Sequence, residues 1–221
     1  MKTTYLKEFI DYSAKKIAFV PMGTLEWHGN HLPIETDFLV AQKICELLNK
    51  KAKAYILPPI YLGTDRERVL GGKKFIGMNS KFGKELQGSV YYLKPALLFS
   101  MVQGLVDNLA KQGFAKIYIV TGHAGSKQIE VLEKIEEYNR NVFLLNPYGV
   151  LSLNIEHADE YETSLFWACY PEQEVISRKA KIKDDDDYIK FVGYDPRERA
   201  SLKLGNKTLK DMISGLKKKI K

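Results

Sequence analysis

Short apolar runs alternate along the chain with longer segments in which apolar residues recur every three or four positions. A continuous apolar run bounded by turn-forming residues is typical of a buried strand, and the longer spacing is that of one face of a helix. The expected strands are IAFVP (17–21), AYILPPI (54–60), IYIVT (117–121) and VFLL (142–145). The expected helices cover 38–48, 95–111, the segment from GHAG (122–125) to Tyr138, and 163–169. This alternation predicts an α/β fold whose mostly parallel sheet carries helices on both faces.

Residues 64–80 do not follow this pattern. They are polar and contain three glycines, so we expect a long loop, and a long loop within a compact domain is often functional. No linker-like composition and no repeat divides the rest of the chain. The sequence therefore predicts a single domain, residues 1–221.

Composition places the chain among ordinary globular proteins. Hydrophobic residues make up 45% of its 221 residues and charged residues 28%. The sequence has no run of about 18 apolar residues, and its first ten residues lack the apolar core of a signal peptide. We therefore expect a cytoplasmic protein. Cys45 and Cys169 stand far apart in apolar segments, and we expect them to be buried hydrophobes rather than a disulfide or a metal site.

The net charge of +7 adds little to the prediction of partners. Its most concentrated part is a lysine-rich C-terminus, which we read as the solvated face of a last helix because no aromatic residues are interleaved with the basic ones. Neither a nucleic acid nor a membrane is expected as a partner. The aspartate run 184–187 lacks the glycine of a cation-binding loop, and we expect it to be a solvated loop.

Histidines and acids gather where three of the expected strands end. In open α/β sheets, ligands bind beyond the carboxyl ends of the strands, so these side chains are expected to meet in one site. Carboxylate oxygens and imidazoles suit zinc, manganese or iron, and a carboxylate such as that of Asp37 can bridge two cations. The clustered residues are Glu26, His28, His31 and Asp37 after the first strand, His123 after IYIVT, and Glu156, His157 and Glu162 after VFLL.

Three motifs resemble the creatininase (creatinine amidohydrolase) family. VPMGTLEWHGNHLPIETD (20–37) is similar to the family's hallmark P-x-G-S-x-E-x-H-G-x-H-L-P with a later aspartate. TGHAG (121–125) resembles its N-G-H motif, and IEHADEYETSLFWACYP (155–171) resembles its catalytic segment. The similarity spans about residues 15 to 172, with the motifs in the family's order and spacing.

The resemblance implies an α/β fold with a binuclear metal centre that hydrolyses cyclic amides, formamides or related C–N bonds of small molecules. It puts Glu26, His28, Asp37 and His123 on metal-ligand positions and His157 on the catalytic histidine. Glu162 is expected either to bind metal or to orient His157. One or two divalent cations per chain are expected, zinc or manganese, with Fe²⁺ a further candidate. The resemblance also implies a homo-oligomer, and hexamers are known in the family. We expect substrate contacts from His31, Glu156 and Asn154.

The sequence departs from the family at three places. Creatininase carries a carboxylate two residues after the N-G-H histidine, where this chain has Gly125. It has Trp-Asp before Ile-Glu-His, where this chain has Leu153-Asn154. The segment 64–68 also departs from the S-x-E-H of many relatives. Creatinine is therefore not the expected substrate.

Three alternatives stay open. One is a deformylase or small-peptide hydrolase on the same fold. Another is a sugar-phosphate or nucleotide-derived substrate, for which the candidate phosphate contacts are Arg66, Arg68, Lys73 and Lys74. The third is a non-catalytic metal- or ligand-binding relative, which the missing carboxylate at Gly125 motivates.

Overall fold

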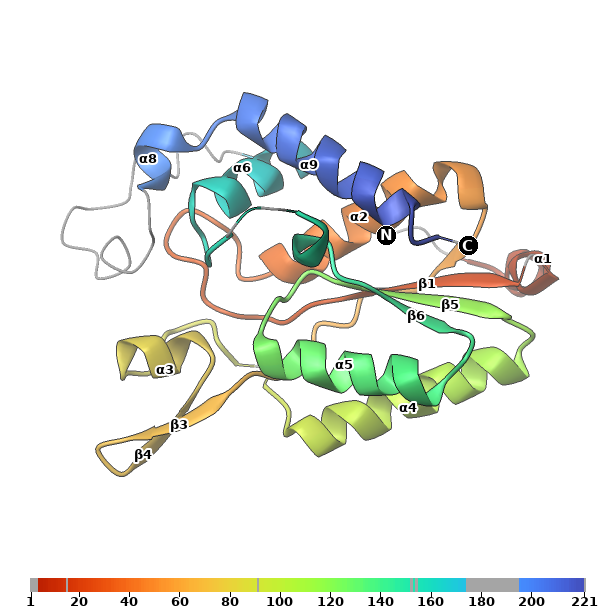
Figure 1. Ribbon diagram of the computed structural model, residues 1–221, viewed down its shortest axis with the longest axis horizontal. Coiled ribbons are helices and arrows are strands. Elements are labelled where there is room, and N and C mark those ends of the chain that lie inside the picture. The colour runs from red at the N-terminus through yellow and green to blue at the C-terminus, as the bar shows by residue number, and fades with distance from the viewer. Residues whose placement is uncertain are drawn as a thin grey trace.

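The central sheet has four parallel strands in the order β2–β1–β5–β6 (Figure 1). The computed structural model describes residues 4–14, 16–90, 92–151, 153, 155–173 and 195–220. The strands are β1 (Ile17–Met22), β2 (Tyr55–Ile56), β5 (Lys116–Thr121) and β6 (Val142–Leu145). The predicted α/β fold with its parallel sheet is confirmed. The second strand is shorter than expected because Pro58 and Pro59 follow it, and proline has no N–H to donate.

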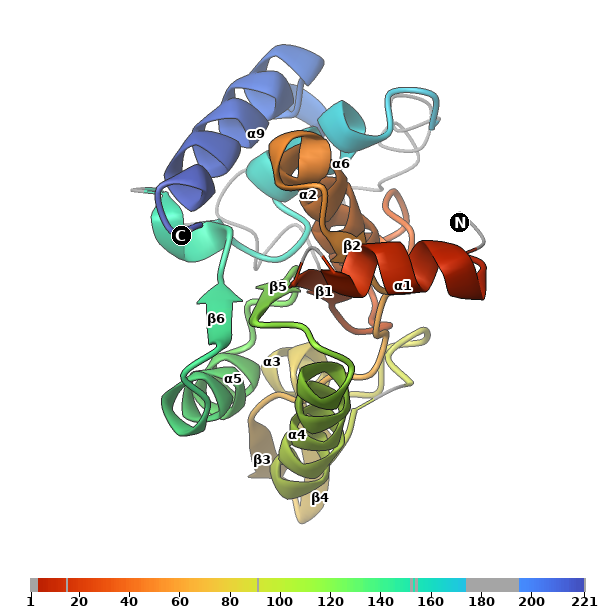
Figure 2. The same cartoon turned by 90° about the vertical axis from the view of Figure 1, so that its right-hand side faces the viewer.

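Helices cover both faces of the sheet (Figures 1 and 2). One face packs against α4 (Pro95–Lys111) and α5 (Ser126–Tyr138), and the other against α2 (Thr36–Ala52), α6 (Glu160–Cys169) and α9 (Leu202–Lys217). The shorter helices are α1 (Leu6–Ala14), α3 (Met78–Phe82), η1 (Tyr148–Val150) and α8 (Pro196–Arg199). The lysine-rich C-terminus does form the last helix. None of the helices in the described ranges is long and apolar enough to cross a membrane.

Alternation along the strands divides the core into two layers. In β1, Ala18, Val20 and Met22 pack with α4 and α5, whereas Phe19 faces α2, α6 and α9. Successive strand side chains point to opposite faces, so a continuous apolar run fills both layers at once. Each large side chain buried in this way stabilises the fold by roughly 1.5–3 kcal/mol. Cys45 and Cys169 are both free and buried, as predicted.

The expectation of a long loop over residues 64–80 is wrong. Strands β3 (Glu67–Leu70) and β4 (Lys73–Ile76) form an antiparallel hairpin there, followed by α3. The turn consists of Gly71 and Gly72, both with positive φ (55° and 77°), which matches a two-residue turn of the hairpin type. The Gly-Gly pair was the available sequence signal for this hairpin.

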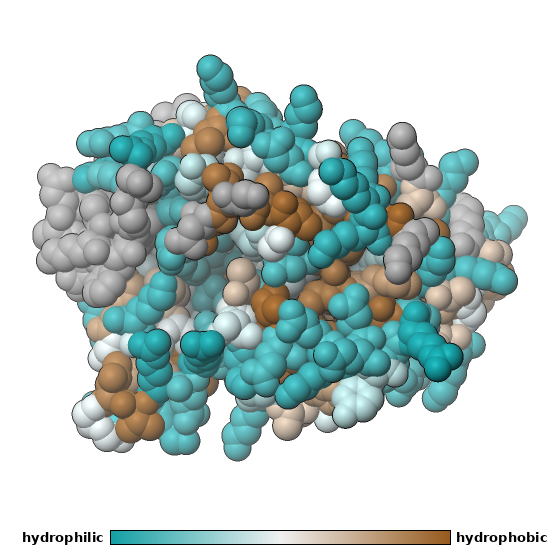
Figure 3. All heavy atoms as spheres, viewed as in Figure 1, coloured by the Kyte–Doolittle hydropathy of each residue, from teal (hydrophilic) through white to brown (hydrophobic). Residues whose placement is uncertain are grey.

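The hairpin projects from the body of the molecule beside α3 (Figure 1). Its tip exposes apolar side chains, visible in Figure 3 at the lower left, where Val69 is 60% and Leu70 41% exposed. Elsewhere on this face, α5 presents a mainly hydrophilic surface. The base of the hairpin lies at the carboxyl end of the sheet and forms one wall of the site described next.

Candidate metal centre

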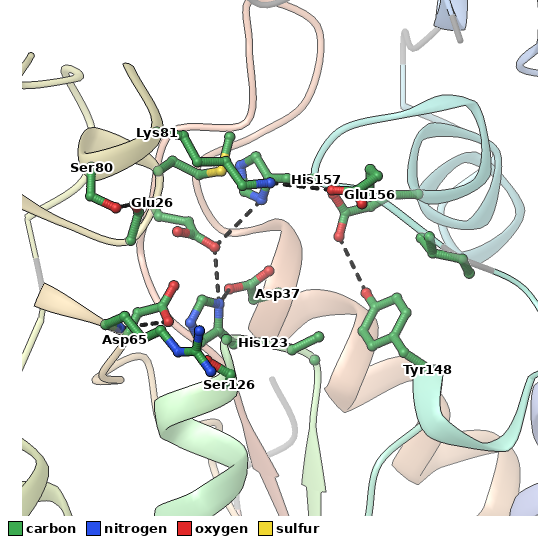
Figure 4. Close-up of a pocket in the computed structure, with 18 of the residues that line it drawn as sticks. Glu26, Asp37, Asp65, Ser80, Lys81, His123, Ser126, Tyr148, Glu156 and His157 are labelled. Atoms are coloured by element: carbon green, nitrogen blue, oxygen red, sulfur yellow. Dashed lines mark hydrogen bonds and ion pairs between the residues drawn. The ribbon is translucent and has the colours of Figure 1, made fainter. Parts of the chain in front are cut away.

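A cavity of about 300 Å³ lies beyond the carboxyl ends of β1, β5 and β6 (Figure 4). Its walls are the loops after these strands, the start of α5 and the β3–β4 hairpin. Six of the residues expected to carry chemistry or bind metal or substrate line it, namely Glu26, Asp37, His123, Glu156, His157 and Glu162. The tertiary structure therefore brings together side chains from three strand ends.

Asp37 reaches the strand ends because α2 begins directly against them. A Cβ atom placed on Gly122, the residue after β5, would lie 1.9 Å from the backbone oxygen of Asp37. Only glycine permits this approach. Asp37 lies in the first turn of α2 and is 2% exposed, and the backbone N–H of Thr24 donates to its Oδ2 over 3.3 Å.

Two groups of potential ligands share Asp37. In the first, Nδ1 of His123 lies 3.0 Å from Oε1 of Glu26 and 3.2 Å from Oδ2 of Asp37. In the second, Nε2 of His28 lies 3.2 Å from Oδ1 of Asp37 and 3.9 Å from Oε2 of Glu162. Within each group, one ligand atom per residue lies within 4.8 Å of the others. Asp37 thus turns one oxygen to each group.

The backbone fixes which nitrogen of His28 is available. Its Nδ1 lies 3.0 Å from the carbonyl oxygen of Glu26, which can only accept a hydrogen bond, so Nδ1 must carry the hydrogen. The neutral ring therefore presents a bare Nε2 to Asp37 and Glu162. A ligating histidine usually has this arrangement, in which its other N–H donates to a carbonyl or carboxylate.

The cluster concentrates negative charge in the protein interior. Glu26, Asp37 and Glu162 are each at most 5% exposed, and no lysine or arginine in the described ranges forms an ion pair with any of them. Burial alone would raise the pKa of Glu26, yet the neighbouring His123, His157 and His28 hold it well below its usual range. Burial likewise opposes charge on His28, but Asp37, Glu162 and Glu26 raise its pKa to about 10. Buried acids of this number need cations, and a divalent metal fits these donors.

Two tyrosines hold the carboxylates, and sequence reasoning missed both. The hydroxyl of Tyr92 donates to Oε2 of Glu26, and that of Tyr148 donates to Oε1 of Glu162 over 3.3 Å. Burial and the nearby Glu162 raise the pKa of Tyr148 well above its ordinary value, so it remains a donor. Neither tyrosine lies in a recognisable motif, because each contact depends on how distant loops fold over the cluster.

The backbone also fixes the tautomer of His157. Its Nε2 donates to the carbonyl oxygen of Trp27, so in the neutral ring Nδ1 carries no hydrogen. This Nδ1 lies 3.6 Å from Oε1 of Glu26. The indole of Trp27 lies roughly parallel to the ring, with centroids 6.3 Å apart. His157 therefore presents a potential base to the cavity, beside the first ligand group.

Of the residues expected to contact the substrate, Glu156 lines the cavity and His31 does not. Glu156 lines the cavity and pairs with Lys81 over 3.2 Å. His31 is fully buried away from the cavity lining, with Nε2 2.9 Å from the hydroxyl of Thr163. Burial and the adjacent His28 and His157 lower the pKa of His31 to about 3, so its ring is neutral. Asn154 and the aspartate run 184–187 lie outside the described residues.

Gly125 leaves space that two side chains occupy. A Cβ atom there would lie 2.3 Å from Nε2 of His123, 2.9 Å from Cγ of Asp65 and 3.0 Å from its Oδ1. Figure 4 shows Asp65 and His123 side by side near the start of α5. Nε2 of His123 is buried and has no hydrogen-bond partner among the described atoms. The absence of a side chain at position 125 thus decides where the ring of His123 lies.

Known proteins resemble this chain over most of its length. The sequence model of the creatininase family, described as creatinine amidohydrolase, matches residues 2–214. Creatinine amidohydrolase of Pseudomonas putida is 25% identical to the chain over 182 residues. That alignment covers 71% of this chain and 65% of the relative, just under two thirds of the relative's length.

Solved structures show the same fold. A creatininase mutant of the zinc–zinc type superposes with a TM-score of 0.72 at 20% identity, covering 97% of this chain and 94% of that one. A manganese form of creatininase gives a TM-score of 0.71 at 21% identity, with the same coverage. The family model covers nearly the whole sequence, and this chain belongs to the creatininase family.

Proposed function

We propose that the protein is a metal-dependent amidohydrolase that cleaves a C–N bond, other than a peptide bond, in a cyclic amide or formamide-type small molecule. The observation that carries this proposal is the position of Asp37, whose two oxygens face two different groups of carboxylate and imidazole donors. One carboxylate shared between two such groups suits a pair of adjacent cations.

The donor sets follow from the distances above. Glu26, Asp37 and His123 would hold one cation, and His28, Asp37 and Glu162 the other. Glu162 would then supply the carboxylate that is missing at Gly125. Zinc and manganese suit these donors, and similar solved structures are described as zinc–zinc and manganese forms. Such cations, when bound, would lower the pKa of a water ligand and polarise the substrate carbonyl.

His157 is the proposed proton carrier. In its neutral tautomer, Nδ1 can accept a proton on the cavity side while Nε2 remains tied to the Trp27 carbonyl. The protonated ring can then deliver that proton to the leaving nitrogen, and the bond to Trp27 keeps its orientation throughout. Tyr92 and Tyr148 hold Glu26 and Glu162 in place during these steps.

Metal content and activity test this proposal together. Purified protein should contain between one and two divalent metals per chain by elemental analysis. Treatment with a chelator should abolish hydrolysis of a panel of cyclic amides and formamides, and zinc, manganese or iron should restore it. Full activity in metal-free protein would contradict the mechanism. Bound metal without hydrolysis of any panel member would favour the non-catalytic relative.

Matched variants separate ligand roles from catalysis. Glu26→Gln should lower both metal content and activity, whereas Glu130→Gln, on the exposed face of α5, should change neither. His157→Gln should retain metal and lose most activity. Loss of metal from His157→Gln would instead make this histidine a ligand.

A single domain over residues 1–221, a cytoplasmic location and a homo-oligomer remain predictions. Analytical ultracentrifugation of the metal-loaded protein would test self-association, and a monomer at micromolar concentration would contradict it.

A further inference from the structure

The cavity contains a feature that hydrolysis alone does not require. Arg66 and Arg68 line it together with the metal-ligand cluster. We propose that these two arginines bind an oxyanion on the substrate, a phosphate ester or a carboxylate, while the C–N bond to be cleaved lies at the cluster. This inference deepens the proposed function and rests on it for the identity of the reaction.

The hairpin directs both arginines to the same side. Arg68 lies in β3 and Arg66 directly precedes that strand. Residues two apart in an extended segment share a face, and both arginines line the cavity, whereas Glu67 between them does not. Glu67 accordingly forms an ion pair with Lys74 across the hairpin, over 2.9 Å. Neither Lys73 nor Lys74 lines the cavity. The structure therefore favours two of the four basic residues considered from sequence as anion contacts.

The base of the hairpin is held in place. The backbone N–H of Arg66 donates to Oδ1 of Asp65 over 2.7 Å, and its carbonyl accepts from the N–H of Gly77 over 3.1 Å. These hydrogen bonds fix the backbone at the base of the hairpin, from which both arginine side chains extend.

Neither guanidinium has a protein partner among the described residues. In the part of the chain that the structure describes, neither forms an ion pair or side-chain hydrogen bond, whereas Lys74, Lys81 and Lys127 all have carboxylate partners. The two guanidiniums carry like charges and line the same cavity, so an anion that binds both would relieve their mutual repulsion. The planar fork of each guanidinium suits the oxygens of phosphate or carboxylate.

Their surroundings favour an anion further. Ser126, at the first turn of the 13-residue α5, lines the same cavity, so the positive end of that helix dipole faces it. A neighbouring hollow bordered by the same two arginines also contains Lys94 and Lys127. Five acids line the cavity as well, namely Glu26, Asp37, Glu162, Asp65 and Glu156. The proposed cations would neutralise the first three, and Lys81 pairs with Glu156. The chain's net charge of +7 would attract anionic substrates.

Binding of inorganic phosphate tests the arginines without relying on catalysis. We would titrate metal-loaded protein with phosphate by calorimetry, comparing the native protein with Arg66→Gln, Arg68→Gln, the double variant and Arg140→Gln. Arg140 is exposed between α5 and β6, at the opposite end of the sheet, and is the control. Each single variant should bind phosphate about tenfold more weakly and the double variant about a hundredfold, since each charged hydrogen bond contributes about a factor of ten or more. Unchanged affinity in the double variant would overturn the inference.

Three matched probes identify the anion. N-formyl-O-phosphoethanolamine, N-formyl-β-alanine and N-formylethanolamine carry a phosphate, a carboxylate and no charge beside the same formamide. The double variant should raise the KM of the anionic probe that the pocket prefers, leave its kcat nearly unchanged, and have no effect on the neutral probe. Equal KM increases for all three probes would overturn the inference and leave the proposed hydrolase intact. Arginine-dependent phosphate binding without hydrolysis of any probe would support the anion site and count against the proposed function.

Discussion

Gly125→Ala should weaken metal binding as well as destabilise the fold. Gly125 has φ −53° and ψ 125°, a backbone conformation that alanine adopts without strain, so the effect is purely steric. The new methyl group would lie 2.3 Å from Nε2 of His123 and 2.9 Å from Cγ of Asp65. Ordinary contacts between such atoms are about 3.5 Å or longer, so the imidazole must move by about 1 Å.

A shift of that size has two consequences. Overpacking of this kind costs roughly 1–3 kcal/mol of stability, which calorimetric unfolding of the metal-free variant would measure. A displaced His123 ring no longer meets Glu26 and Asp37 at its present distances, so we expect metal affinity to fall by about 10- to 100-fold.

Competition with a chelator of known affinity gives the metal dissociation constant. Another glycine, one that lies within a helix, provides the control. Gly104 lies in α4, and a Cβ atom there meets nothing within 4 Å. Gly104→Ala should leave metal affinity unchanged and stabilise the fold by about 0.5–1 kcal/mol. Wild-type metal affinity in Gly125→Ala would refute the argument that the empty space at position 125 determines where His123 lies.

Three further predictions concern the same cluster. Glu162→Gln should lower the affinity for one of two metal ions and leave the affinity for the other unchanged, so a metal titration should separate into two steps. An equal loss of affinity for both ions would count against two ligand groups that share Asp37. Metal binding should release protons, because the pKa of His28 is about 10 in the metal-free protein and its ring must lose a proton to bind. Metal affinity should therefore rise with pH up to about 10, and calorimetry at pH 8 in two buffers of different ionisation enthalpy should give different apparent heats; identical heats would refute this. Tyr92→Phe should weaken metal binding by about tenfold because Glu26 loses its hydrogen bond, whereas Tyr138→Phe, at a side chain 77% exposed, should not.

Local pattern was enough to predict the architecture and to indicate most of the residues that line the candidate site. Continuous apolar runs marked β1, β5 and β6 because a strand buried on both faces needs apolar residues at every position. The same reading placed Glu26 and His123 at strand ends, and parallel strands bring such ends to one edge of the sheet. Family resemblance then selected the candidate metal ligands from among the nearby polar residues.

Only the tertiary structure decided which of those residues lie together and which line the cavity. Sequence left Glu162 between two roles, and the distances place it with His28 and Asp37. His31 stood in the richest motif, yet it is buried against Thr163, outside the cavity lining. Tyr92 reaches Glu26 across 66 positions of sequence. Strand and helix patterns depend only on neighbours a few residues away, so the sequence is enough to predict them. Contacts such as that between Tyr92 and Glu26 depend on how distant loops cross above the sheet, so they can be found only in the tertiary structure.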